Sequence, residues 1–321
     1  MKRFFIVIIA VVFITLFIPL AIVLLMGKTI DNSNPADIPE TAEMVKVYIK
    51  QTDTVCDMDI NTYLTGVTAA EMPADFEVEA MKAQAVAART YLVSHMYDSA
   101  SGNTAEEHKG AVICTDSTHC QAWVSEQDFK QNRENADEKW DKITLAVKDT
   151  SGEIITYKNK PISAVFFSTS SGRTENAEDV WGKEIPYLKS VKSKGDELSP
   201  RYESEENFSI EDFKKKAEEK ISGIDWNNGL FGNIERSKAG GIKTIDIGGV
   251  TVKGTDFRTI YGLRSTNAEI LEKDNNIKIS VKGFGHNVGM SQYGANYLAS
   301  QGEDYKKILK SYYSGVSIEK R

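Results

Sequence analysis

The strongest amphipathic pattern in the chain runs over residues 77–97 and predicts a helix. Its apolar positions recur at helical spacing and form a broad stripe suited to burial: Ala80, Ala83, Val86, Ala87, Ala88 and Tyr91. Alanine is the best helix former and lets neighbouring backbone approach closely. Lys82, Gln84 and Arg89 interrupt this stripe. Because Pro73 cannot lie inside a helix, Glu71 is expected on a turn just before it.

Weaker patterns predict the remaining elements. Alternating or β-prone runs predict strands at residues 44–55, 154–157, 162–167 and 277–281, and a glycine-punctuated hairpin at 240–256. Helical periodicity is typical of residues 125–150, 205–221 and 305–313. Helices and strands interleaved in this way predict one large mixed α+β domain over residues 44–321, with a topology that the pattern leaves open.

An apolar run, Phe4–Met26, is long enough to cross a membrane and longer than the apolar region of a usual signal peptide. Lys2 and Arg3 precede it, and acidic residues follow it. This asymmetry predicts a cytosolic tip at residues 1–3, a single retained transmembrane helix and a domain outside the cytosol. Residues 27–43 are expected to be a linker, since they are rich in Asn, Ser and Pro.

The formal net charge of −7 and a pI of about 5.4 argue against nucleic acid, whose binding needs a basic surface. Charged residues make up 26% of the chain, an ordinary share for a globular protein. These values leave a neutral glycan possible as a ligand.

His108, Cys114 and Cys120 form an H-x5-C-x5-C pattern, and thiolate and imidazole are good zinc ligands. A zinc site is therefore predicted on these three residues, with water or another side chain as the fourth ligand. Three alternatives remain open: a Cys114–Cys120 disulfide, two buried thiols, or His119 in place of His108.

Five stretches in order carry a specific resemblance: EMP at residues 71–73 with its helix, HKGAVICTDSTHC at 108–120, AVFFSTSSGRTENAEDVW at 164–181, GFGHNVGMSQYGA at 283–295 and ILKSYYSGV at 308–316. Together they resemble the sporulation protein family that carries the SpoIID/LytB domain. The resemblance covers nearly the whole predicted α+β domain and implies that this domain has a substrate groove. It implies a lytic transglycosylase of peptidoglycan whose catalytic acid is Glu71.

A lytic transglycosylase needs a carboxylic acid that is protonated at neutral pH, and an apolar pocket supplies this by disfavouring the charged form. Val67 and Met72 are expected walls of that pocket. The resemblance implies that Glu71 acts first as acid and then as base, so that the muramic C6 hydroxyl closes on C1. No second carboxylate is needed, in contrast to ordinary glycosidases.

The resemblance also makes Arg89 an active-site residue, placed on the substrate because a charge beside Glu71 would lower the pKa of that acid. The hydroxyls and carboxyl of Ser168, Ser171 and Glu175 follow a predicted buried strand and suit a sugar. Tyr187 and Tyr293 lie in segments similar to those that line the family's cleft, and core packing is the alternative for Trp181. His286 and Gln292 complete the expected substrate-binding set.

Some family members carry zinc in the H-x5-C-x5-C pattern and others lack it, which implies a metal that the reaction does not require. The resemblance further implies denuded glycan strands as substrate, stage II sporulation proteins P (an amidase) and M (a membrane scaffold) as partners, and a membrane-anchored enzyme facing the space between the two membranes around the forespore during engulfment. Two other functions remain possible: a zinc-dependent hydrolase of the cell wall, and a glycan-binding scaffold without activity.

Overall fold

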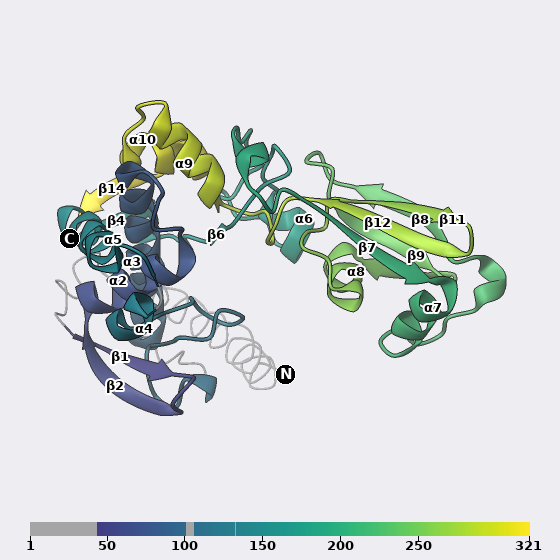
Figure 1. Ribbon diagram of the computed structural model, residues 1–321, viewed down its shortest axis with the longest axis horizontal. Helices are drawn as coiled ribbons and strands as arrows, with labels where there is room; N and C mark the ends of the chain where they lie inside the picture. The colour runs from purple at the N-terminus through teal and green to yellow at the C-terminus, as the bar shows by residue number, and fades with distance from the viewer. Residues whose placement is uncertain (1–43, 101–105, 132) are drawn as a thin grey trace, which may run out of the picture. The chain divides into compact units, whose positions relative to one another are not determined.

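The structure is a computed structural model that describes residues 44–100, 106–131 and 133–321 (Figure 1). These residues belong to one compact unit, residues 41–321, in which short strands alternate with helices. The mixed α+β class is therefore confirmed. The strands form several small sheets whose pairs are mostly antiparallel.

Helix α3 (Val78–Ala100) confirms the helix predicted over residues 77–97. It packs against other parts of the same body (Figure 1): α2 (Ile60–Glu71), α5 (Ala136–Asp149), α9 (Gln292–Ser300), α10 (Tyr305–Tyr312) and β4 (Glu153–Tyr157). Its alanines from Ala80 to Ala88 are all buried, and their small side chains let these elements approach closely.

Small sheets flank these helices. They have the strand orders β2 (Thr54–Asp59)–β1 (Met44–Ile49)–β3 (Ile113–Cys114), β14 (Ser317–Lys320)–β4–β5 (Lys160–Pro161), and β13 (Met290–Ser291)–β6 (Phe166–Phe167). β13 and β6 pair in parallel, which joins the end of the 162–167 run to the start of α9.

A second hydrophobic core lies within residues 203–282. Its elements are β7 (Glu203–Ser209), α7 (Ile210–Glu218), β8 (Phe231–Arg236), β9 (Ile242–Ile247), β10 (Val250–Lys253), α8 (Gly254–Tyr261), β11 (Ala268–Lys273) and β12 (Asn276–Lys282). β12 lies between β7 and β11 (Figure 1) and buries Ile277, Ile279 and Val281 on one face. β9 and β10 confirm the predicted hairpin.

Two helix predictions are wrong in extent. Residues 125–150 form two helices, α4 (Glu126–Lys130) and α5, because Asn135 between them takes a left-handed φ of 52°. The predicted helix over 205–221 begins only at Ile210, where the side chain of Ser209 caps α7. Residues 205–209 instead belong to β7, which pairs with β12 along its whole length.

The strand predictions need two changes. The run at 44–55 is β1 followed by a turn and the start of β2. Of the run at 162–167, only Phe166–Phe167 is a strand. The remaining short helices are the α-helix α6 (Ala177–Trp181) and the 3-10 helices η2 (Glu106–His108), η3 (Asp196–Leu198) and η4 (Trp226–Asn228).

The structure corrects the predicted membrane location. None of the helices in residues 44–100, 106–131 and 133–321 is long and apolar enough to cross a membrane. The predicted tip, anchor and linker, residues 1–43, lie outside the described residues.

Candidate active site

Glu71 is the last residue of α2 and not, as expected, a turn residue between secondary elements. The side chain of Asp59 caps the start of α2, and the backbone N–H of Met72 still donates to the carbonyl of Thr68 at 3.0 Å. Pro73 follows, and α3 begins at Val78. The acid therefore lies at the carbonyl end of a helix, where partial negative charge disfavours an ionised carboxylate.

The surroundings of Glu71 favour the neutral acid. Burial raises the pKa of Glu71, and hydrogen bonds from the Ala122 backbone and the Gln292 side chain lower it by less. The Ala122 N–H donates to Oε1 at 2.8 Å. This environment disfavours the ionised form of Glu71, and two hydrogen-bond donors lie within reach of its carboxyl group.

A close contact between α2 and the loop after β3 holds Ala122 in place. The N–H of Val124 donates to the carbonyl of Gly66 at 3.3 Å, and the indole of Trp123 lies directly over Gly66. A Cβ at position 66 would overlap that indole, so only glycine permits this approach.

Glu71 lines a cavity of about 680 Å³, called here the Glu71 cavity. Its lining is Glu71, Tyr91, residues 117–122, residues 165–168, Trp181 and residues 284–286. Val165, Phe166 and Phe167 make the apolar wall, whereas the expected walls Val67 and Met72 are buried in the core. Among the described residues that line this cavity, Glu71 carries the only carboxylate.

Two of the predicted substrate-binding residues line the Glu71 cavity: Ser168 and His286. Burial lowers the pKa of His286 to about 4, so the ring is neutral at neutral pH. Its Nδ1 accepts from the N–H of Val288 at 3.1 Å, and the ring also bonds the backbone of Phe166. His286 is therefore a fixed wall of the cavity and not a proton carrier.

Gln292 does not line the cavity but bonds Glu71, and its amide also contacts Gln84 at 3.5 Å. Tyr293 packs edge-on against Phe76, with ring centroids 4.9 Å apart. Tyr293, Tyr187 and Ser171 do not line the cavity. The Tyr187 hydroxyl accepts from the N–H of Ser163 at 3.1 Å, and Ser171 accepts from the Asn267 amide at 3.1 Å.

Arg89 corrects the expectation of a substrate-binding guanidinium. It is 2% exposed, and it is absent from the residues that line the Glu71 cavity. Its Nη1 donates to the carbonyl of Thr150 at 2.6 Å and its Nη2 to that of Val147 at 3.0 Å. Arg89 thus satisfies carbonyls at the end of α5, which an α-helix leaves without partners.

A candidate metal centre lies beside the cavity. The ligand atoms of His108, Cys114, His119 and Cys120 all lie within 4.8 Å of one another. His108 Nε2 is 3.1 Å from His119 Nδ1 and 3.2 Å from Cys120 Sγ, and Cys114 Sγ is 3.6 Å from His119 Nδ1. Ligands of tetrahedral zinc are separated by roughly 3.3–3.8 Å, so this set fits the ion.

Burial shifts the pKa of two members of the cluster. It lowers the pKa of His108, which keeps its imidazole neutral and able to bind a metal. It raises the pKa of the Cys120 thiol to about 12, so this thiol would lose its proton only on binding a metal. The three cysteines are free thiols, which removes the disulfide alternative. His119 joins His108 instead of replacing it, so the donor set has four members where the spacing suggested three.

Sequence reasoning missed Ala122 and Tyr91, and it favoured core packing for Trp181. Ala122 contributes its backbone N–H, which every residue type except proline has, so the amino-acid sequence does not single it out. Its position two residues after Cys120 was the available clue. Trp181 is 45% exposed and lines the cavity. Its ring lies 5.4 Å from that of His286.

The chain is similar in sequence to several known proteins. The SpoIID family model, described as Stage II sporulation protein, matches residues 48–157, which include Glu71 and the His/Cys cluster. Stage II sporulation protein D of Bacillus amyloliquefaciens is 42% identical, covering 88% of this chain and 80% of that protein. The Bacillus subtilis protein of that name is 41% identical, covering 89% and 80%. The amidase enhancer of Bacillus subtilis is 26% identical, covering 79% of this chain and 40% of that protein. An acid and a His/Cys cluster within the matched segment, with this identity over most of two curated relatives, show that the chain belongs to the stage II sporulation protein D family.

Proposed function

We propose that the protein is a lytic transglycosylase that cleaves the bond between N-acetylmuramic acid and N-acetylglucosamine in denuded peptidoglycan strands. The observation that carries the proposal is Glu71: a half-buried acid whose pKa is raised by burial, on a cavity whose described lining has no other carboxylate. A glycosidase of the usual kind needs two carboxyl groups. One protonates the leaving group, and the other activates water or attacks C1.

The proposed reaction uses Glu71 twice. The neutral acid gives its proton to the glycosidic oxygen, and the bond from C1 to that oxygen breaks as positive charge develops on the muramic ring. The C6 hydroxyl of the same ring then bonds to C1 and returns its proton to the Glu71 carboxylate. The products are a 1,6-anhydromuramic end and a free N-acetylglucosamine hydroxyl, and the acid is restored without water.

The hydrogen bonds of Glu71 support this double role. The Ala122 N–H, 2.8 Å from Oε1, and the Gln292 amide stabilise the carboxylate that exists between the two proton transfers. The apolar wall of Val165, Phe166 and Phe167 limits water at the reacting carbon.

Zinc is the metal that we propose for the His108, Cys114, His119 and Cys120 cluster. Bound there, it would stabilise the thiolates and hold the loop that ends at Ala122. Four protein ligands leave no open position for water, and this closed arrangement is typical of structural sites. The alternative of a zinc-dependent wall hydrolase, which needs an open position, is therefore disfavoured.

The family name supports a role in sporulation, and the amidase enhancer among the relatives suggests a cell-wall setting. We propose that the strand is first stripped of stem peptides by an amidase, stage II sporulation protein P, and that stage II sporulation protein M works with both during engulfment of the forespore.

The decisive experiment is mass spectrometry of denuded strands after incubation with the protein and with Glu71→Gln. We expect 1,6-anhydromuramic ends from the parent and a loss of about 10²–10⁴-fold in the variant, because the amide cannot donate a catalytic proton. Thermal unfolding and strand binding should be retained. Glu77→Gln, an exposed acid six residues away, is the matched control and should cleave normally. Full cleavage by Glu71→Gln would refute the assignment of the acid.

A further inference from the structure

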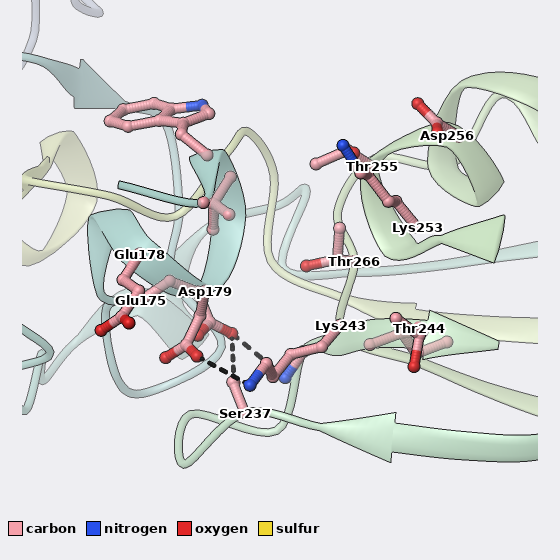
Figure 2. A pocket seen from close by; sticks show the side chains of 15 residues that line it. Glu175, Glu178, Asp179, Ser237, Lys243, Thr244, Lys253, Thr255, Asp256 and Thr266 are labelled. Carbon is pink, nitrogen blue, oxygen red and sulfur yellow. Dashed lines mark hydrogen bonds and ion pairs between the residues drawn. The ribbon is translucent and has the colours of Figure 1, made fainter. Parts of the chain in front are cut away.

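A second pocket of about 380 Å³ lies between α6 and the β9–β10–α8 region, and it is called here the distal pocket. Figure 2 shows Glu178 and Asp179 of α6 on one side and Lys253, Thr255 and Asp256 on the other. Lys243 and Thr244 of β9 also line the pocket, and Lys243 reaches toward Asp179. The pocket lies outside the 48–157 segment that the family model matches.

Glu175 gives the distal pocket an unused hydrogen-bond acceptor. Its side chain is 3% exposed and lines the pocket. Oε1 accepts from Ser237 Oγ at 2.8 Å and from the Gly241 N–H at 3.1 Å (Figure 2), whereas the buried Oε2 has no partner among the described residues. A buried carboxylate oxygen without a partner is costly, so a ligand that donates a hydrogen bond to it would be stabilised.

The charges of the distal pocket do not require an ionic ligand. The Lys243 ammonium lies 3.3 Å from Asp179 Oδ1 (Figure 2) and 3.1 Å from Glu235 Oε1, so a positive charge already occupies the acidic side. A metal cation would meet that ammonium. Hydroxyls of Ser237, Thr244, Thr255 and Thr266 line the remaining space. Neutral groups that both donate and accept hydrogen bonds suit this lining best.

Trp181 connects the distal pocket to the Glu71 cavity, because it lines both. It is the last residue of α6, and 45% of its surface is exposed. The backbone reinforces this connection: the N–H of Glu175 donates to the carbonyl of Asn287, next to the cavity residue His286, at 2.6 Å. An extended ligand can therefore reach from one pocket to the other along an exposed aromatic face.

We propose that the distal pocket binds a further sugar unit of the same glycan strand, with a sugar hydroxyl donating to Glu175 Oε2 and an intervening ring stacked on Trp181. Sugar rings have an apolar face of C–H groups that suits an indole, and their hydroxyls suit the polar lining. This inference rests on the proposed function, since it takes the ligand class from it. It predicts that the protein prefers strands long enough to occupy both sites.

The experiment measures binding separately from cleavage, using the full chain with Glu71→Gln and denuded strands of two lengths in calorimetric titrations. The substitution Thr255→Trp, made in the same chain, places an indole ring in the distal pocket. We expect it to weaken binding of a strand several disaccharides long by about tenfold and to leave a single disaccharide unaffected. Thr259→Trp, on the same helix but outside the pocket lining, is the matched control and should change neither affinity.

Glu175→Gln is a second variant that keeps an amide oxygen for Ser237 and Gly241 but replaces the unpartnered oxygen with an NH₂ donor. We expect it to weaken the long strand only, with little change in the thermal unfolding midpoint. The distal site would be overturned if the Glu71→Gln chain bound the long strand equally well with and without Thr255→Trp or Glu175→Gln.

The distal site and the proposed function fail in different ways. Cleavage to anhydro ends that is equally fast for short and long strands, and unchanged by Thr255→Trp, overturns the distal site and leaves the function. Length-dependent binding without any anhydro product overturns the function and leaves the site. Strands that do not bind at all overturn both.

Discussion

Glu71 and Glu175 are both acids whose pKa is raised by burial, but the chain uses their oxygens differently. Glu71 bonds donors that can stabilise a carboxylate formed during a reaction, and it lines the larger cavity. Glu175 bonds Ser237 and Gly241 through one oxygen and leaves the other without a partner. Hydrogen-bond geometry therefore separates the acid that we propose for proton transfer from the one that we propose for ligand binding.

The pH dependence of cleavage should report the pKa of Glu71. A general acid must be protonated in the free enzyme, so kcat/KM should be high below that pKa and fall as pH rises through it. Because the Gln292 hydrogen bond lowers this pKa, Gln292→Leu should move the falling limb to higher pH. Rates measured over a pH series on denuded strands test this. A limb that stays in place, or moves to lower pH, would contradict the role assigned to Gln292.

Residue types alone could predict some of these roles and not others. The motif in which Glu71 lies predicts it as the acid, and its raised pKa is consistent with that prediction. Arg89 shares the same helix, but helical spacing did not reveal that its guanidinium reaches the carbonyls of Thr150 and Val147 from another element. The Ala122 N–H could not be predicted from any side chain.

At the scale of elements, the segment from His108 to Ala122 links the His/Cys cluster to Glu71. η2 and β3 supply His108 and Cys114, and the turn after β3 supplies His119 and Cys120. The next residues lead directly to the N–H that bonds Glu71. β3 pairs with β1 through only two residues, so a metal would add much to the order of this segment.

Metal removal should therefore act on the position of the loop and not on the chemistry itself. Protein purified without chelator or nickel resin should hold about one zinc ion per chain, because two histidines and two cysteines together can bind one ion. Cys114→Ala should lose the metal and lower cleavage by about 10–100-fold without abolishing it, as expected for an indirect support. Cys56→Ala, the thiol outside the cluster, is the control and should keep both metal and activity. Metal analysis and cleavage assays decide, and metal-free parent protein would refute the site.

Element boundaries show where sequence patterns fail. Residues 205–209 begin a stretch whose pattern predicts an amphipathic, lysine-rich helix, but full-length pairing with β12 makes them a strand. Such pairing depends on residues about seventy positions away and outweighs a weak local preference. α3 was predicted well because its alanine-rich face is buried on several sides, so local propensity and packing agree.

At the scale of the whole described body, Asp196 joins segments that are far apart in the sequence. Its carboxylate accepts from the Ser170 N–H at 2.7 Å and the Ser170 hydroxyl at 2.8 Å. It also accepts from the hydroxyls of Ser193 and Ser291, and Ser193 bonds the hydroxyl of Tyr312 at 2.8 Å. The loop after β6, the start of α9 and the end of α10 thus meet at one fully buried acid.

Asp196→Asn should destabilise the fold because its NH₂ group would face hydroxyl and N–H donors in a fully buried site. We expect the free energy of unfolding in urea to fall by about 2–4 kcal/mol, the range for losing charge-assisted hydrogen bonds and leaving donors without partners. Activity should fall as well, since Ser291 precedes Gln292 and a shift there alters the Gln292 contact with Glu71. Asp274→Asn, at an exposed left-handed position that asparagine tolerates, is the control and should stay near the parent. Unfolding of Asp196→Asn at the same urea concentration as the parent would mean that these segments are held together by packing alone.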